Sequence, residues 1–400
     1  MELPHDHPPR RFLLPWYNRV LSAINTAIPF LIPTQRTNLA LLVSAILKKQ
    51  TLCLSELARA YPTSEERRVP APKHDLLHRI KRLWRFVDNE RVDALEVQMA
   101  LVAYTIACLG HPRLLGLAVD WTMFNTTLPS GEQIRYQVLR IAVPRKGRAI
   151  PLLQLAYDRD NLPAKSQNQI EQDALLAVVG ALPSGICPII LADRGFARAT
   201  FFRWLENHHL HYVVRIDKGT CLTQSDGQRW KLGEEGLRPG QLRWAPNVRY
   251  GLYHGRPRTI VLNVALCWRV SKSRAKNPRR KQPKEPWYLA TSLGGARSAA
   301  SWYWQRGWIE QSFKDAKSRF GLAGVRVGSP ERLGRLLMAL TIALSWLTLM
   351  GLPESGLLPR GFRASVSAWG RASVISLALS LLEKLGDLPS CCLPQSHHRE

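Results

Sequence analysis

The most restrictive feature of this sequence is a change of pattern near residue 113, where helical periodicity gives way to short strands. The apolar run at 114–120 (LLGLAVD) is bounded by polar residues, as in a buried strand. Similar segments at 136–144 and 149–157 follow with short connections, which predicts an antiparallel meander. Next come a predicted helix, strand, helix and strand, at 169–182, 187–193, 197–208 and 211–216. Strands followed by alternating helices and strands predict a mixed α/β domain.

The chain carries a large positive charge, with 56 Lys and Arg against 30 Asp and Glu, or +26 at pH 7. Such an excess favours a polyanionic partner, most commonly nucleic acid, over a membrane-adjacent or ribosome-associated role. Before residue 113 the pattern is helical, and the segment at 76–86 (LLHRIKRLWRF) predicts a helix with a basic face that could contact DNA or simply face solvent. The run at 269–284 holds eight basic residues and no acid, which is typical of a solvated loop or of a phosphate-contacting one.

One segment, at 336–353, contains no charged residue and could be read as a short membrane span. Its Thr, Ser and Gly content and the Pro at its end favour a buried core helix instead. The seven cysteines show no CxxC or Cys/His cluster, which argues against a zinc site and fits a reducing compartment. The first residues show no apolar signal segment, so we expect a cytoplasmic protein without a membrane contact.

Two acidic residues follow apolar strands. Asp120 ends the run at 114–120, and Asp193 ends the one at 187–193. An aspartate there places a carboxylate at the edge of a hydrophobic sheet, where ligands and metals bind. The competing interpretation is a turn former or a helix cap, the commoner role of an aspartate after a strand.

A third pattern lies in a long helix predicted from about Ser298 to Phe320. Tyr303, Arg306, Glu310 and Lys317 fall at about 0°, 300°, 340° and 320° around it, at ~100° per residue, and so share one face. An amphipathic helix with an Arg–Glu pair four residues apart would give part of this pattern.

The spacing Tyr303-x2-Arg306-x3-Glu310-x6-Lys317 resembles the signature of the insertion-sequence-4 (IS4-type) family of DDE transposases. Asp120 in DWT and Asp193 in DRGF are similar to the family's other two acidic motifs, and their order is kept. The resemblance implies an α/β fold with an RNase H-like catalytic core, a β-rich insertion and a helical N-terminal region.

The resemblance also implies a metal-dependent active site. Asp120, Asp193 and Glu310 would be the catalytic residues and the ligands of two Mg²⁺ or Mn²⁺ ions. Clustered carboxylates repel one another, and hard divalent cations bound by oxygen ligands offset that repulsion. Two such ions can activate the attacking oxygen and stabilise the leaving one.

Tyr303, Arg306, Lys317 and Trp287 are expected to bind DNA because they match positions of the family. Arg215 and Lys218 are further candidates for contacts with the DNA backbone, because they lie at the end of the last strand before the insertion. Thr122 and Arg194 are expected close to the acids. Arginine suits bidentate phosphate contacts, whereas lysine acts as a point charge. Trp287 would stack on a base flipped out at the cleaved end, although a tryptophan in the core of a central strand is the alternative.

The resulting hypothesis is a cut-and-paste DNA transposase with a helical DNA-binding region, a core interrupted by a basic β-rich insertion, and a C-terminal region. The predicted boundaries are 1–112, 113–218, 219–286, 287–353 and 354–400. Its partners would be the terminal inverted repeats of its element, target DNA and a second copy of itself in a synaptic dimer, and it would be a bacterial, cytoplasmic protein that joins the nucleoid when bound to DNA. The alternatives are a catalytically degenerate, transposase-derived DNA-binding protein, a magnesium-dependent nuclease and a membrane-anchored basic protein.

Overall fold

The structure, a computed structural model, describes most of the chain. The described residues are 13–60, 73–163, 166–251, 259–269, 285–352, 374–376 and 378–379. Of the basic run at 269–284, only Arg269 is among them. Within the C-terminal region predicted at 354–400, residues 374–376 and 378–379 are helical, and the remainder lies outside the described residues.

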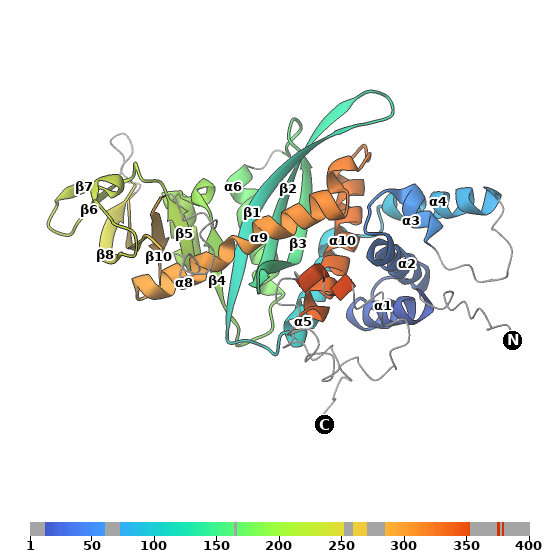
Figure 1. The fold of residues 1–400 in the computed structure, drawn as a ribbon, viewed down its shortest axis with the longest axis horizontal. Helices are drawn as coiled ribbons and strands as arrows, with labels where there is room; N and C mark the ends of the chain where they lie inside the picture. Colours follow the sequence, from blue (N-terminus) through green and yellow to red (C-terminus); the bar gives the residue numbers. More distant parts are fainter. Residues whose placement is uncertain are drawn as a thin grey trace, which may run out of the picture.

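One mixed sheet runs through the molecule (Figure 1), with the strand order β3-β2-β1-β4-β5-β10-β9-β8-β6-β7. The strands, in chain order, are β1 (Leu114–Thr127), β2 (Gln133–Arg145), β3 (Arg148–Asp158), β4 (Cys187–Ala192), β5 (His211–Ile216), β6 (Cys221–Thr223), β7 (Arg229–Lys231), β8 (Leu242–Tyr250), β9 (Ile260–Cys267) and β10 (Trp287–Thr291). The predicted meander is confirmed, because β1, β2 and β3 pair antiparallel.

The first five strands have the arrangement of an RNase H-like core. β4 joins the meander parallel to β1, and β5 lies parallel to β4. The carboxyl ends of β1, β4 and β5 therefore point toward the same edge of the sheet, where ligands of α/β folds bind. The fold class predicted from the sequence, a mixed α/β fold with helices in the N-terminal region, is confirmed.

The strands after residue 219 continue this same sheet. β10 pairs antiparallel with β5 on one side and with β9 on the other, and β9 pairs with β8. The β-rich insertion expected at 219–286 is thus joined to the core by backbone hydrogen bonds through β10 in its described part. Its predicted boundaries, like the other domain boundaries, stay a prediction.

The two faces of the sheet are covered by different helices, because strand side chains alternate between faces. Ala118, Leu191 and Val213 belong to a cluster with residues of α8 and α9, and these helices cross that face (Figure 1). Val119, Ile190 and Val214 belong to a cluster on the other face, with residues of α5, α6 and α7. The bounds of these helices are Ala94–Cys108 (α5), Gln167–Gly180 (α6), Ala199–Asn207 (α7), Ala296–Arg306 (α8) and Trp308–Lys314 (α9).

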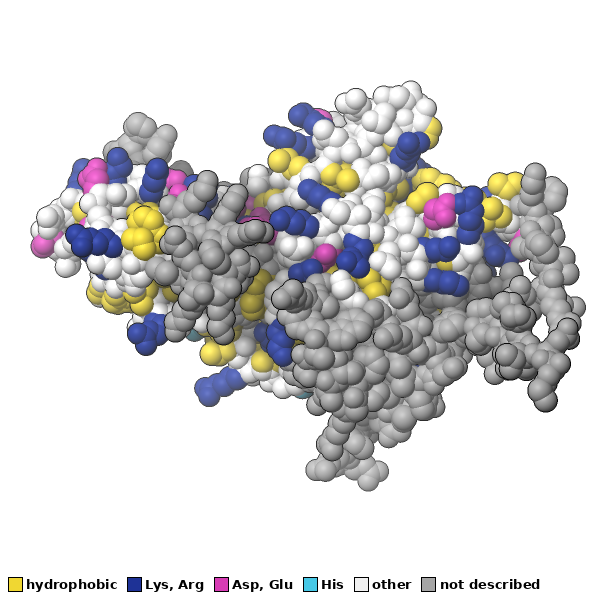
Figure 2. Space-filling view, in the orientation of Figure 1, with side chains coloured by type: hydrophobic (Ala, Val, Ile, Leu, Met, Phe, Trp, Pro, Cys, Tyr) yellow, Lys and Arg dark blue, Asp and Glu magenta, His cyan; other side chains and the backbone are white. Residues whose placement is uncertain are grey.

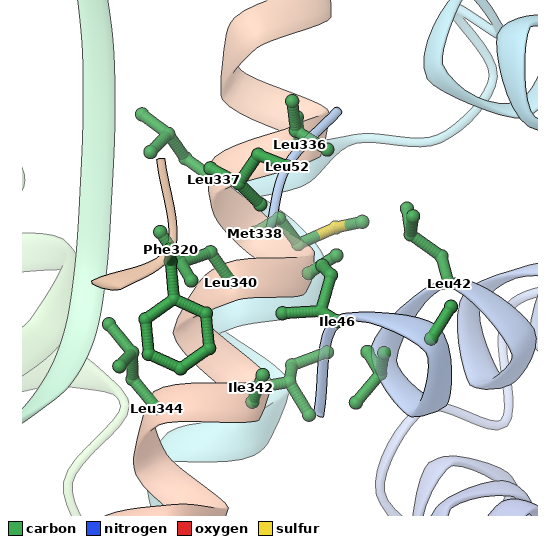
Figure 3. Packing of buried hydrophobic residues seen from close by; sticks show 14 of the residues in the cluster. Leu42, Ile46, Leu52, Phe320, Leu336, Leu337, Met338, Leu340, Ile342 and Leu344 are labelled. Carbon is green, nitrogen blue, oxygen red and sulfur yellow. The ribbon is translucent and has the colours of Figure 1, made fainter. Parts of the chain in front are cut away.

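The charge-free segment forms most of α10 (Pro330–Met350), which packs between β3 and the N-terminal helices. In its most apolar 18-residue window, 89% of the residues are buried, so this helix is a core helix, as predicted. Leu42 and Ile46 of α2 face Met338 and Ile342 of α10 (Figure 3). The helices before the sheet are α1 (Leu13–Ala27), α2 (Pro33–Lys49), α3 (Leu54–Arg59) and α4 (Lys73–Val87), with α5 following them.

Candidate active site

Asp120 and Asp193 lie side by side where β1 and β4 part. Their strands are paired up to Val119 and Ala192, and each aspartate is the next residue. The expectation that Asp120 ends its strand is wrong, since β1 continues to Thr127 paired with β2 alone. Asp193 does end its strand and begins a 3₁₀ turn.

Asp193 caps the turn, as the competing interpretation predicts, and still points its second oxygen into the acid cluster. Its Oδ1 accepts a hydrogen bond of 2.8 Å from the amide of Gly195, which caps the turn. Its Oδ2 lies 3.5 Å from Nη2 of Arg306. Asp120 likewise uses one oxygen locally, accepting 2.9 Å from the amide of Trp121, and turns the other toward Arg306. Each aspartate is thus held by its own backbone while presenting an oxygen to the site.

The helix with the third acid is not one continuous α-helix, which corrects the expectation from its sequence. Gly307 separates α8 from α9, and α9 passes into a π-helical turn, η4 (Asp315–Arg319). Tyr303, Arg306 and Glu310 remain close across the break. The face calculated for an ideal helix therefore applies to the first three residues but not to Lys317, which lies in the π-helical turn.

Arg306 stands between the three acids. Its Nη2 donates 2.7 Å to Asp120 Oδ2 and is paired with Asp193, and its Nη1 donates to Glu310 Oε1. The exposed fraction of the side chain rises from 13% for Asp120 through 36% for Asp193 to 56% for Glu310. The cluster therefore opens toward solvent on the side of Glu310 and is closed beneath Asp120.

Burial dominates the electrostatics of this cluster. It raises the pKa of Asp120 to about 6, with Arg306 opposing the rise and the charges of Asp193 and Glu310 adding to it. Burial also disfavours the charge on Arg306, but the neighbouring anions outweigh it, so the pKa of that guanidinium is raised. Three carboxylates share one guanidinium, and this leaves negative charge that a further cation would offset.

These residues fit a hard divalent cation by donor type and by charge. All three offer carboxylate oxygens, which Mg²⁺ and Mn²⁺ prefer, and the outermost acid is open to solvent. Across the described part of the chain, no three acidic, histidine or cysteine side chains are close enough to share an ion as they stand. In the acid cluster, it is the guanidinium of Arg306 that lies among the oxygens.

Aromatic and basic residues flank the acids along the same edge. Trp287 begins β10 and contacts Tyr303 edge to face, with ring centroids 5.1 Å apart. Tyr303 is buried, and burial raises the pKa of its hydroxyl to about 12. Arg215, near the end of β5, is paired with Glu285. Trp304, which the sequence did not single out, is 42% exposed beside Trp287 and lies beneath the Arg269 guanidinium.

The remaining expected residues lie further from the acids. The Lys317 ammonium donates 2.7 Å to the carbonyl of Met123, and burial lowers its pKa. Lys218 is exposed just past β5, and Arg194 pairs with Asp217 rather than with an acid of the cluster. Thr122 shares the strand face of Asp120, two residues further along β1.

A polar network beneath the cluster was missed from the sequence. Arg140 on β2 is fully buried, donates to Gln154 on β3, and donates 2.6 Å to Ser312 on α9. Its guanidinium lies 4.1 Å from the ring centre of Phe313. The available signal was an arginine in the middle of the apolar strand YQVLRIAVP, since a buried charge is rare without partners.

Comparison with known proteins identifies a family for most of the core. A family model described as Transposase DDE domain matches residues 112–346, which covers β1 to most of α10 and includes all three acids. A search of curated proteins finds no match to the chain. Because the match extends over more than half of the sequence, the chain belongs to the family of proteins with a transposase DDE domain.

Proposed function

We propose that this protein is an IS4-type transposase that cuts DNA at the ends of its element and joins the freed 3′-OH ends to target DNA. Membership of the DDE transposase family supports transposase function and, with it, polynucleotidyl transfer. The observation that carries the finer proposal is the meeting of Asp120, Asp193 and Glu310 around Arg306. These acids come from two strands and a helix far apart in the sequence.

The three acids would hold two Mg²⁺ or Mn²⁺ ions. When bound, such ions activate an attacking oxygen and stabilise the leaving oxygen of a phosphodiester. The protein's own contribution is to fix the oxygens: Trp121 and Gly195 amides hold one oxygen of each aspartate. Glu310, the most exposed of the three, is the acid best placed to adjust as substrate enters.

The flanking residues would contact the DNA backbone and the cleaved end. Arg306 and Tyr303 adjoin the acids, and Trp287 with Arg215 extends the site along the sheet edge. The half-buried Trp287 ring offers a surface for a displaced base. Lys317 would exchange the Met123 carbonyl for a phosphate oxygen, and the exposed Lys218 would meet the backbone further along.

The N-terminal helices would bind DNA away from the cut. Figure 2 shows Lys and Arg side chains spread across one face of the molecule, with few acidic ones among them. On α4, Lys81, Arg82 and Arg85 are exposed together with Trp84. The helix is anchored through Arg332 of α10, which pairs with Asp88 and lies 5.8 Å from the Trp84 ring centre. The expected partners are terminal inverted repeats, target DNA and a second copy of the chain.

Such an enzyme is expected to be soluble and cytoplasmic. The apolar helix α10 does not argue against this, since it is buried in the protein core. A bacterial source and association with the nucleoid follow from the proposed family alone.

A cleavage assay tests this proposal. Labelled duplexes with the ends of the encoding element would be incubated with protein, with and without Mg²⁺ or Mn²⁺. We expect nicking at the element boundary only with metal, followed by joining to a target duplex. Asp120→Ala, Asp193→Ala and Glu310→Gln should bind the same duplexes without cutting them, while Asp226→Ala, at an exposed turn, serves as the matched control.

Each contrary result has a specific meaning. Wild-type protein that binds but does not cut with either ion would identify a degenerate DNA-binding protein. Metal-dependent cutting without any joining would identify a nuclease. Normal cutting by one of the three variants would remove that acid from the proposed set.

A further inference from the structure

We propose that Glu171 is a positioning residue that clamps together the two chain segments carrying Asp120 and Asp193. The proposal concerns the acid cluster of the proposed transposase and so rests on that function for its catalytic consequence. Past Val119 and Ala192, β1 and β4 form no further ladder pairs with each other, so backbone hydrogen bonds between these strands do not hold the two aspartates together.

Glu171 lies on α6, beneath the point where β1 and β4 part, and is 1% exposed. Its Oε1 accepts hydrogen bonds of 2.8 Å from Trp121 Nε1 and 3.2 Å from Gln167 Nε2. Its Oε2 accepts from Arg198 Nη2. A carboxylate this deeply buried is tolerated only with such donors around it.

The first arm of the clamp reaches β1. Trp121 follows Asp120, and the two side chains point to opposite faces of the sheet because neighbouring residues alternate. The indole packs against the cluster that faces α6, and the carboxylate faces α8 and α9. Fixing the indole nitrogen therefore fixes the strand at the residue next to Asp120, where only β2 still pairs with it.

The second arm reaches the turn after β4. Arg198, held by Glu171, donates from Nη1 to the carbonyl of Gly195 at 3.0 Å. The amide of Gly195 in turn donates to Asp193 Oδ1. Asp193, Gly195, Arg198 and Glu171 thus form one chain of contacts from the acid to α6.

A glutamate suits this position better than a neutral side chain. It has two oxygens, so it accepts from an indole and a guanidinium at once, and bonds to a charged donor are stronger than neutral ones. Glu171→Gln keeps the acceptor for Trp121 but turns an amide donor toward Arg198. Arg198→Met cuts the turn arm alone, and Trp121→Phe cuts the strand arm alone.

Hydrogen–deuterium exchange of the metal-free protein without DNA tests the clamp directly. In Glu171→Gln and Arg198→Met, we expect the amides of 193–196 to exchange at least tenfold faster than in the wild type. In Trp121→Phe, the acceleration should move to 120–123. The amides of α10 should be unchanged, and Asp173→Asn, an exposed acid on the same helix, should behave as the wild type.

A purely structural role predicts another pattern. Faster exchange spread evenly over the core, or no change near the aspartates in any of the three variants, overturns the proposal. If one variant fails to fold, the others still test the clamp, because Arg198→Met reports on the turn arm and Trp121→Phe on the strand arm. Wild-type exchange in Asp173→Asn is required for the assignment to stand.

Cleavage kinetics add the catalytic consequence. With element-end duplexes, Glu171→Gln and Arg198→Met should lose at least tenfold in kcat, with KM for DNA within about twofold of the wild type. Unchanged kcat in both variants would limit Glu171 to folding and overturn the proposal. If the wild type does not cleave at all, the proposed function fails, whereas the exchange result still decides whether Glu171 holds the two segments.

Discussion

Asp120 on β1 and Arg140 on β2 are direct register partners, and Gln154 on β3 continues the same row. An acid of the candidate site thus neighbours a fully buried guanidinium on the same face of the sheet. Arg140 reaches from this row to Ser312, two residues after Glu310. The row therefore links the strand that carries one acid to the helix that carries another.

The first prediction concerns Ser312. Ser312→Ala removes the acceptor of a buried charged donor, so we expect a loss of about 1.5–3 kcal/mol in the free energy of unfolding. Ser345→Ala is the matched control, because that buried hydroxyl donates to the neutral carbonyl of Pro151. The control should lose only about 1 kcal/mol. Urea unfolding measures both, and equal losses would contradict a stabilising contact between Ser312 and Arg140.

The second prediction concerns pH. Burial raises the pKa of Asp120 from 3.8 to about 6, so the folded state holds this proton more tightly than the unfolded chain does. The carboxyl favours folding below about pH 4, and this contribution is lost as pH rises through about 6. Asp120→Asn cannot ionise, so between pH 4 and 7 it should gain on the order of 1–3 kcal/mol of stability relative to the wild type.

Unfolding in EDTA at several pH values measures the stability gap, which is the difference in the free energy of unfolding between the variant and the wild type. Asp160→Asn is the control, because the hydrogen bond from Arg135 lowers the pKa of Asp160. Its gap should change in the opposite direction, with the wild type gaining as pH rises. A gap for Asp120→Asn that does not vary with pH would show that the folded state leaves the Asp120 proton unperturbed.

The third prediction concerns the contact of α8 with β1. A Cβ on Gly116 would lie 3.1 Å from the Trp302 ring and 3.2 Å from Leu191, so Gly116→Ala forces both side chains to move. We expect a loss of about 1–3 kcal/mol. In Gly334→Ala, on α10, the added Cβ meets nothing within 4 Å, and a gain of about 0.5–1 kcal/mol is expected. Thermal unfolding separates the two, and a neutral Gly116→Ala would mean that α8 is not closely packed there.

The fourth prediction concerns α4. If this helix contacts phosphates, Lys81→Ala and Arg85→Ala should each lower the slope of log affinity against log salt by roughly one. Arg59→Ala is the control, because Arg59 lies in the same region but is paired with Glu56. Binding of element-end DNA at several salt concentrations measures the slopes. Unchanged slopes in both α4 variants would place the DNA elsewhere.

Much of the fold follows from the sequence, because alternation and apolar runs record which faces are buried. The meander, β4, β5 and the core helix α10 were all predicted from such patterns. The extent of β1 was not, since its outer half pairs only with β2 and carries mixed polarity. The break at Gly307 and the π-helical turn were also missed, because an ideal helical period has no term for either.

The sequence motifs indicated which acids would meet, but they did not predict which residues lie between and beneath those acids. The position of Arg306 between the acids depends on how α8 crosses β1 and β4, which is set by packing rather than by local pattern. Glu171 gave no sequence signal, since an acid on a helix is ordinarily solvated. Only the fold reveals that its partners come from β1 and from the turn after β4.

Helix α10 shares a hydrophobic core with α2 and β3, and this core limits how far the N-terminal helices can lie from the acid cluster. Helix α4 contacts α10 through Arg332. The sheet that carries the acid cluster packs against the same helix through β3. Residues 73–163 are described without a gap, and within them only α5 and short turns separate α4 from β1. If α4 binds a terminal repeat, α10 fixes the distance between that repeat and the acid cluster. Adding or removing a few base pairs between the repeat and the scissile bond would then prevent the protein from contacting both at once.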